Sequence, residues 1–171
     1  MNGPGRFCYK HPRPALTVDV VLFRVSSTSG RAAGDGRRPL GDLLSSAALE
    51  VLLIQRGRPP FEGAWALPGG FVEPDEAPDD AARRELAEET GLDAPGLTQI
   101  GAFGDPGRDP RGWVVSTAYR AIMDRAGSDR QSPSLTPGDD ATGARWWAID
   151  DLPPLAFDHA EIIARARRAG V

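Results

Sequence analysis

Three glutamates that follow a pair of glycines are the residues of this sequence best suited to chemistry. Glu85, Glu88 and Glu89 stand at i, i+3 and i+4, so they share one face if their segment is helical. Carboxylates gathered in this way either form a solvated acidic face or bind a hard divalent cation, which prefers oxygen ligands. Taken alone, the spacing favours the solvated face.

The element that must position these glutamates is a helix predicted from about Pro78 to Thr90. Pro78 suits the first helical position, and Asp79 and Asp80 place negative charge at the positive end of the helix dipole. Most residues that follow are good helix formers, and Gly91 supplies a C-terminal stop. The three glutamates are therefore expected to project from one side of this helix.

Gly69 and Gly70 precede the loop that leads into the predicted helix. Two glycines permit a tight bend and a close approach of the backbone to a ligand. The Gly69 carbonyl can therefore add an oxygen to those of the carboxylates. A strand end, a loop and a helix arranged in this way can hold a metal ion against a phosphate chain.

The segment from Gly70 to Leu92 resembles the Nudix box: Gly, five residues, Glu, seven residues, then Arg-Glu-hydrophobic-x-Glu-Glu-x-Gly-hydrophobic. The matching residues are Gly70, Glu76, Arg84, Glu85, Leu86, Glu88, Glu89, Gly91 and Leu92. The resemblance implies hydrolysis of a nucleoside diphosphate linked to another moiety. It also implies Mg²⁺ or Mn²⁺, held by the three glutamates and the Gly69 carbonyl, since divalent ions can neutralise the charge of a pyrophosphate and orient a water.

Arg84 has two interpretations. It can be a plain i,i+4 partner of Glu88 on the helix surface. The resemblance implies instead that Arg84 orients carboxylates of the box, including that of Glu76, and this structural role is favoured. The predicted catalytic set is Arg84, Glu85, Glu88 and Glu89.

The general base stays open between two regions of the chain. Glu89 is the first candidate, because a carboxylate beside a metal-bound water is well placed to take its proton. Asp139 and Asp140, in a later polar loop, are secondary candidates. Glu73 has two equally favoured interpretations: it contacts the metal or the attacking water, or it is a surface acid that precedes the helix.

Three other segments are similar to the ADP-ribose pyrophosphatase branch of the Nudix family, and to the Nudix-like domains of regulators of NAD metabolism. They are residues 60–72, 105–111 and 155–159. The resemblance implies cleavage of ADP-ribose to AMP and ribose 5-phosphate. Two alternatives stay open: hydrolysis of another nucleotide, such as a damaged nucleoside triphosphate, and non-catalytic sensing of ADP-ribose. The intact box and a chain end shortly after the last expected helix favour an enzyme.

Arginines and aromatic residues in and near these segments are the predicted substrate contacts. Arg56, Arg108 and Arg111 can fork onto phosphate oxygens, and Phe61 can stack on adenine. A solvated loop arginine or a core aromatic is an equally good interpretation of each. Further aromatic candidates are Phe103, Trp113 and Phe157. His159 is expected to be an ordinary surface histidine beside a helix cap.

The remaining sequence predicts one α/β domain, in which strands alternate with two good helices. The resemblance implies an α/β/α sandwich with a mixed sheet, from about Leu16 to Arg168. The expected strands are 15–25, 49–55, 65–67, 97–103, 113–123 and 144–149, and the last helix is 158–168. Residues 15–171 form the predicted Nudix domain, with an extended arm at 1–14 and a flexible insertion at about 26–47.

The charge and composition of the sequence restrict the expected binding partners and cellular compartment of the protein. The formal net charge of −4 offers no basic field for nucleic acid, and no apolar run approaches the length of a membrane span. Cys8 is the only cysteine and the N-terminus lacks a signal-peptide core, so a cytoplasmic protein without disulfides is expected. The expected partner is a nucleotide small molecule, and a homodimer is left open.

Overall fold

The computed structural model describes residues 10–25, 49–93, 96–123 and 141–168. The expected insertion at 26–47 and the candidate bases Asp139 and Asp140 lie outside these ranges. Within the described residues, no helix is long and apolar enough to cross a membrane.

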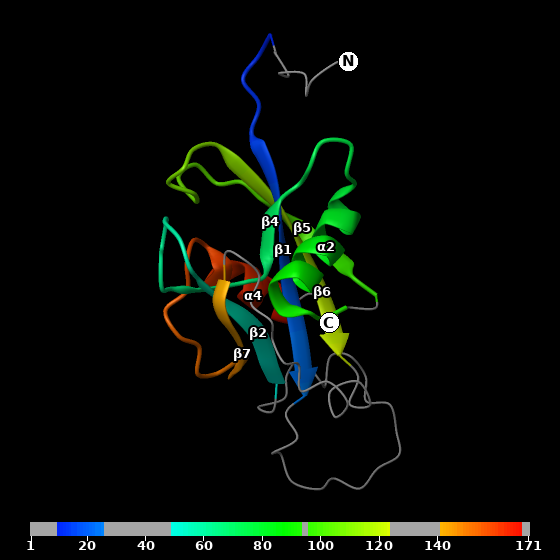
Figure 1. Cartoon of the computed structure of the whole chain (residues 1–171), viewed down its shortest axis with the longest axis vertical. Helices are drawn as coiled ribbons and strands as arrows, with labels where there is room; N and C mark the ends of the chain where they lie inside the picture. The colour runs from blue at the N-terminus through cyan, green and yellow to red at the C-terminus, as the bar shows by residue number, and fades with distance from the viewer. Residues whose placement is uncertain (1–9, 26–48, 94–95, 124–140, 169–171) are drawn as a thin grey trace, which may run out of the picture.

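Seven strands and two helices make up the described part of the chain (Figure 1). The strands are β1 (Ala15–Val25), β2 (Leu49–Arg56), β3 (Trp65–Ala66), β4 (Gly69–Phe71), β5 (Thr98–Phe103), β6 (Val114–Met123) and β7 (Ala141–Ala148). The helices are α2 (Pro78–Thr90) and α4 (His159–Arg168). The α/β class is confirmed, and most predicted boundaries lie within one to three residues of these.

The sheet is mixed, as predicted, and β1 is its central strand. Its main path runs β3-β2-β1-β6-β5, with β4 paired to β1 and β7 paired to β2. Only β1 and β6 are parallel among these pairs. On its other edge, β1 pairs with β4 through residues 17–19 and with β2 through residues 23–25. The sheet therefore divides along β1, between β4 and β2.

The two helices cover opposite faces of this sheet, because successive side chains of β1 point to opposite sides. Val18, Val20 and Leu22 pack in one core cluster with α2, whose buried residues include Leu86. Val21 and Phe23 pack in a second cluster with Ile162, Ile163 and Ala166 of α4. Burial of these apolar side chains fixes α2 on the sheet and so fixes the side from which its glutamates project.

Helix α2 begins and ends at the residues the sequence predicts. Pro78 is its first residue, and Asp79 and Asp80 lie in its first turn. Gly91 ends it in the left-handed region at φ 69°, donating its N–H to the Ala87 carbonyl. The Tyr119 hydroxyl of β6 donates to the Asp79 carboxylate at 2.7 Å and ties the first turn to the sheet.

The glycines before the box form a strand rather than the expected bend. Gly69 and Gly70 pair with Asp19 and Val18 of β1 as part of β4. A Cβ added at Gly69 would overlap the Val18 carbonyl oxygen. Glycine is therefore needed because two backbones approach closely; the predicted close approach was to a ligand, whereas the neighbour seen here is strand β1.

Gly69→Ala is expected to lower the free energy of unfolding by more than about 2 kcal/mol, because the clash is with backbone that cannot move aside cheaply. Urea denaturation measures this loss. Gly63→Ala is the control: Gly63 has φ +79°, with nothing within 4 Å of an added Cβ, so it should cost only about 1 kcal/mol. Equal losses would contradict the close-packing explanation.

Candidate active site

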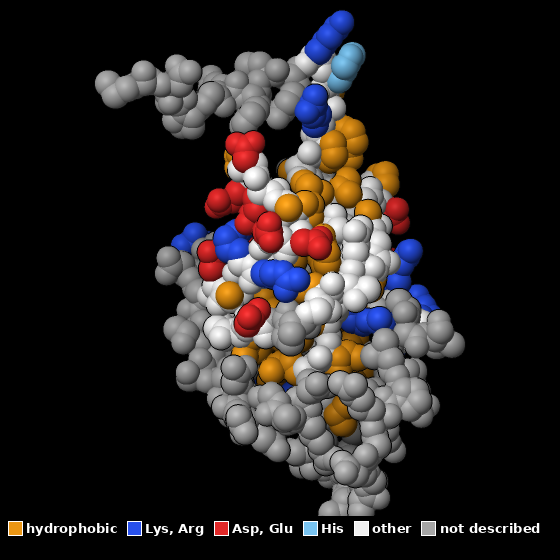
Figure 2. Space-filling model, turned by 90° about the vertical axis from the view of Figure 1, so that its right-hand side faces the viewer, with side chains coloured by type: hydrophobic (Ala, Val, Ile, Leu, Met, Phe, Trp, Pro, Cys, Tyr) orange, Lys and Arg blue, Asp and Glu red, His pale blue; other side chains and the backbone are white. Residues whose placement is uncertain are grey.

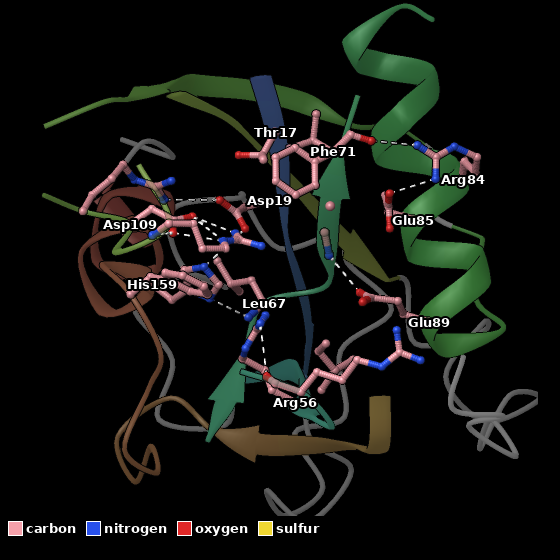
Figure 3. Close-up of a pocket in the computed structure, with 18 of the residues that line it drawn as sticks. Thr17, Asp19, Arg56, Leu67, Phe71, Arg84, Glu85, Glu89, Asp109 and His159 are labelled. Carbon is pink, nitrogen blue, oxygen red and sulfur yellow. Dashed lines mark hydrogen bonds and ion pairs between the residues drawn. The ribbon is translucent and has the colours of Figure 1, made fainter. Parts of the chain in front are cut away.

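A cavity of about 400 Å³ lies where the sheet divides along β1 (Figure 3). Residues of β1, β2, β4, α2 and the loops at 105–111 and 157–159 line it. Of the predicted site residues it brings together Arg56, Gly69, Arg84, Glu85, Glu89, Arg108 and Arg111. Glu73 also lines the cavity, whereas Glu88 and Phe61 do not.

Two glutamates of α2 form an acidic wall against the glycine strand. Glu89 accepts a hydrogen bond from the Gly69 N–H at 2.9 Å. Glu85 lies so close to Gly70 that a Cβ added there would overlap its carboxylate. Figure 3 shows both side chains reaching from α2 toward β4. Spacing of four residues on one helix face and the absence of side chains at Gly69 and Gly70 of β4 together permit this contact.

Arg84 joins the acidic residues of the box into one network. Its Nε and Nη2 donate to the two oxygens of Glu76 at 2.8 and 2.9 Å. Its Nη1 donates to Glu85 at 2.8 Å and to Glu88 at 3.2 Å, and Nη2 also donates to the Phe71 carbonyl. The hydrogen bonds from Arg84 lower the pKa of Glu76 to about 2. Arg84 thus makes the contacts of both interpretations, the orienting fork and the i,i+4 pair.

Glu88 departs from the three-carboxylate face expected from the helix spacing. Its side chain is 60% exposed and turns toward Arg84 rather than into the cavity. Among the described side chains, no three acidic, histidine or cysteine groups converge into a ready metal site. The physical reason is that Glu85 and Glu89 are held inside the cavity by Arg84 and Gly69, while Glu88 contacts Arg84 from the exposed surface of the helix.

Burial changes the acidity of the two glutamates in the wall. Burial raises the pKa of Glu85 above its ordinary value of 4.5, against the opposing effect of Arg84. Burial raises the pKa of Glu89 to about 8; the Gly69 hydrogen bond opposes this rise and the charge of Glu85 adds to it. An oxygen-rich wall with unfavourable negative charge suits a divalent cation.

The stability of the metal-free protein is expected to fall as pH rises from about 4.5 to 8, in part because of Glu89. Over this range the folded chain keeps the Glu89 proton, whereas the unfolded chain releases it near 4.5. Ionising the buried group therefore costs the folded state up to a few kcal/mol. In EDTA, Glu89→Gln should flatten the profile of Tm against pH, while Asp80→Asn on the exposed side of α2 should follow the wild type. Parallel profiles for all three proteins would count against this pKa.

Two arginines form a second wall of the cavity, together with aromatic rings. Arg56 donates from Nε to the Pro60 carbonyl at 2.8 Å, and its guanidinium lies 5.0 Å from the centre of the Phe157 ring. The Arg111 guanidinium lies 5.1 Å from the Phe71 ring and 5.5 Å from Phe157. Such cation–π contacts hold planar cations in place without neutralising them.

Hydrogen bonds to a buried carboxylate also hold Arg111 in place. Asp109, whose side chain is 1% exposed, accepts from Arg111 Nε at 3.0 Å and from Nη2 at 2.7 Å. The Arg111 side chain remains 40% exposed. Its fork is therefore oriented while part of the guanidinium still faces solvent at the cavity.

Arg108 is more buried than predicted, and its guanidinium pairs with carboxylates of the protein itself. Its side chain is 5% exposed, its Nε donates to Asp158 at 2.8 Å, and its Nη2 is 3.6 Å from Asp19. Burial lowers the pKa of Arg108, but the hydrogen bond and charge of Asp158 outweigh burial and raise it overall. These contacts hold Arg108 in the cavity lining by ion pairs with Asp158 and Asp19.

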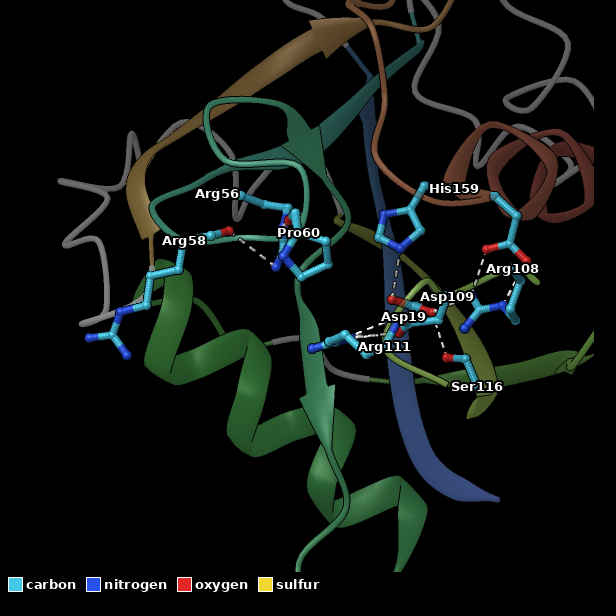
Figure 4. Close-up of polar contacts among 10 residues, drawn as sticks. Asp19, Arg56, Arg58, Pro60, Arg108, Asp109, Arg111, Ser116 and His159 are labelled. Atoms are coloured by element: carbon cyan, nitrogen blue, oxygen red, sulfur yellow. Dashed lines mark hydrogen bonds and ion pairs between the residues drawn. The ribbon is translucent and has the colours of Figure 1, made fainter. Parts of the chain in front are cut away.

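His159 is buried, so its interpretation as an ordinary surface histidine is wrong. It is 4% exposed, its Nδ1 accepts from the Leu67 N–H at 2.8 Å, and its Nε2 lies 3.3 Å from Asp19 (Figure 4). Asp19 also accepts from the Ser116 hydroxyl. The sequence did hold one signal for this cluster: Asp19 interrupts an otherwise apolar core strand, and buried carboxylates require partners.

The aromatic candidates separate into three environments. Phe103 belongs to the core, and Trp113 is 58% exposed and lies outside the cavity lining. Phe61 is 44% exposed and packs edge-on against Phe157, with ring centres 4.8 Å apart. Phe157 and Phe71 line the cavity, and Phe71 was not predicted as a site residue.

The outer face near α2 bears mixed charge. Figure 2 shows acidic and basic side chains interspersed over the described part of this face, without a broad basic surface.

Comparison with curated proteins gives two informative relatives. The chain is 45% identical over 114 residues to the ADP-ribose pyrophosphatase of Methanocaldococcus jannaschii, covering 67% of this chain and 63% of that protein. It is 34% identical over 158 residues to the ADPR responsive transcriptional repressor NtrR of Acinetobacter baylyi, covering 91% of this chain and 54% of the repressor. The chain thus spans less than two thirds of each relative.

Comparison with solved structures and with family models gives two further matches. The NUDIX domain of Shewanella oneidensis NrtR, solved in complex with ADP ribose, is 34% identical with a TM-score of 0.71, over 93% of this chain and 90% of that one. The family model for the NUDIX domain matches residues 43–166, well over half of the sequence. The chain belongs to the NUDIX domain family.

Proposed function

We propose that this protein hydrolyses the pyrophosphate bond of ADP-ribose, giving AMP and ribose 5-phosphate in a reaction that depends on Mg²⁺ or Mn²⁺. The observation that carries the proposal is the pair of opposed walls in one cavity. Glu85 and Glu89 face the glycine strand on one side, and Arg56 and Arg111 lie on aromatic rings on the other. A pyrophosphate needs both kinds of partner, a cation site and arginine donors.

The donors proposed for the cation are the carboxylates of Glu85, Glu88 and Glu89 and the carbonyl of Gly69. All are oxygens, which fits Mg²⁺ and Mn²⁺. The raised pKa values of Glu85 and Glu89 mark a site where a positive ion would be favourable. When bound, the cation would neutralise pyrophosphate charge and help to orient the attacking water.

The chain's own side chains have distinct proposed tasks. Glu89 takes the proton of the attacking water, since its carboxylate lies within the cavity beside the glycine strand. Arg84 holds Glu85 and Glu76 in place. Arg111 binds the ribose 5-phosphate half of the substrate, and Phe71 and Phe157 offer ring faces to the base or ribose. Glu73 lines the same cavity and is a second acid available to the water.

The relatives support the choice of ADP-ribose, and they also support a second candidate function. One is named an ADP-ribose pyrophosphatase, and the Shewanella oneidensis domain was solved with ADP ribose. The Acinetobacter baylyi relative is named a repressor that responds to ADPR, and Shewanella oneidensis NrtR was solved in complex with a 27mer DNA. A sensor that binds ADP-ribose without cleaving it is therefore the alternative. We place the enzyme in the cytoplasm with a nucleotide as its partner.

A substrate panel tests the proposal. The purified protein is assayed with Mg²⁺ on ADP-ribose, nucleoside diphosphate sugars, dinucleotides and nucleoside triphosphates. We expect the highest kcat/KM on ADP-ribose. A triphosphate as the best substrate would overturn the substrate, and tight binding of ADP-ribose without turnover would favour the sensor.

A further inference from the structure

Both ring nitrogens of His159 are engaged, and this fixes the tautomer of the ring. Nδ1 accepts the Leu67 N–H at 2.8 Å, so it carries no proton. The proton therefore lies on Nε2, which faces Asp19 at 3.3 Å. A carboxylate in this place selects one tautomer and orientation of an imidazole, as Asp does in catalytic triads. Here neither nitrogen is left to exchange protons with a substrate.

The backbone segment that is hydrogen-bonded to His159 is also hydrogen-bonded to Glu89, two residues further along. Three consecutive residues are each fixed by a different element: the Leu67 N–H by His159, the Pro68 carbonyl by the Val20 N–H at 2.8 Å, and the Gly69 N–H by Glu89 at 2.9 Å. The close packing of Gly69 on β1 leaves this segment little freedom to shift.

Asp19 anchors the histidine from the central strand. It is 7% exposed and contacts Ser116 of β6 and Arg108 of the 105–111 loop as well as His159 (Figure 4). Asp19 is also the residue of β1 that pairs with Gly69. One buried carboxylate therefore links the start of α4, the sheet and the strand that bears Gly69.

We propose that His159 is a positioning residue of the candidate metal site: by holding the Leu67 amide, it sets the positions of the Gly69 backbone and of Glu89. This inference deepens the proposed function and rests on it, because Gly69 and Glu89 are two of the proposed metal donors. Groups that orient metal ligands from behind commonly change metal affinity when they are removed.

The test compares three variants of the full chain with the wild type. His159→Phe removes both hydrogen bonds, whereas His159→Asn keeps an acceptor oxygen near the place of Nδ1. Ile163→Ala is the matched control, because Ile163 is 3% exposed in α4 and packs in the same core cluster as Leu67, but its apolar side chain makes none of the hydrogen bonds to the Leu67–Gly69 backbone. The readouts are the Mn²⁺ dissociation constant, hydrogen exchange of the Gly69 amide in metal-free protein, and kcat and KM on ADP-ribose.

We expect His159→Phe to weaken Mn²⁺ binding by about 10- to 100-fold, to speed exchange at Gly69, and to lower kcat more than it raises KM. His159→Asn should recover part of each loss, and Ile163→Ala should lose stability with little change in Mn²⁺ affinity. Equal Mn²⁺ affinity and equal Gly69 exchange in His159→Phe and wild type would overturn the inference.

NMR of the ring nitrogens in the wild type keeps the inference falsifiable should His159→Phe not fold. A proton on Nδ1 would overturn it, and a proton on Nε2 alone is expected. These measurements need no ADP-ribose. A wild type that binds Mn²⁺ but leaves ADP-ribose intact would therefore overturn the proposed function, while the His159 comparison would still be decided.

Discussion

Glu89→Gln is expected to reduce kcat on ADP-ribose by about 100- to 10,000-fold, the usual range for loss of a general base. The substitution keeps the shape of the side chain and removes its ability to take a proton. Glu85→Gln should also remove most turnover, because Glu85 is a proposed metal donor within the cavity. Both proteins should remain folded, because glutamine matches glutamate in size and shape.

The position of Glu88 provides an internal comparison. Its side chain is 60% exposed and outside the cavity lining, so Glu88→Gln should lower kcat less than the other two changes. Asp80→Asn, on the exposed surface of the same helix, serves as the control and should leave kcat unchanged. Steady-state assays with Mn²⁺ titrations measure these effects. Unchanged turnover and unchanged metal affinity in both Glu85→Gln and Glu89→Gln would contradict the proposed site.

Arg111→Ala is expected to impair catalysis and Arg108→Ala to impair stability, although the sequence analysis predicted that both arginines contact the substrate. Arg111→Ala should lower kcat/KM on ADP-ribose by about 10- to 100-fold, because a charge-assisted hydrogen bond contributes about 1.5–3 kcal/mol. Arg108→Ala should mainly lower the free energy of unfolding, by about 3–5 kcal/mol, because it leaves the Asp158 and Asp19 carboxylates without their cation.

Two controls accompany this comparison: a lysine substitution that keeps the charge of Arg111, and a second substrate. Arg111→Lys keeps the charge but loses the fork onto Asp109 and the stacking on Phe71, so it should recover little activity. For Arg111→Ala, the loss should be smaller on a nucleoside triphosphate, which lacks the distal ribose. A stable Arg108→Ala whose kcat/KM falls like that of Arg111→Ala would show that Arg108 binds substrate after all.

Local sequence rules were enough for the helix that carries the box. Proline at the start, acids in the first turn and glycine at the end fix α2 between Pro78 and Thr90 without reference to the rest of the chain. The β-rich run at residues 15–25 similarly predicted β1, although it did not predict that side chains on both faces of the strand are buried. These signals act over a few residues, so a single sequence contains them in full.

Contacts between distant residues could not be predicted in this way. His159 meets Leu67 across 92 positions of sequence, and Arg108 meets Asp158 across 50. Whether an arginine faces substrate or a buried acid depends on which loop folds over it, and helix spacing alone could not show that Glu88 turns to solvent. Phe71 likewise enters the cavity only through the pairing of β4 with β1, which no local sequence pattern contains.

The measurement that tests the central claim most directly is the yield of products from ADP-ribose over many turnovers. The wild-type protein is incubated with excess ADP-ribose and Mg²⁺, and AMP and ribose 5-phosphate are quantified by ³¹P NMR, with Glu89→Gln and an EDTA-treated sample beside it. We predict equal amounts of the two products, far exceeding the amount of protein, with little product in either comparison. ADP-ribose recovered intact from the wild type, despite saturable binding, would contradict the account and identify the cavity as a sensor site.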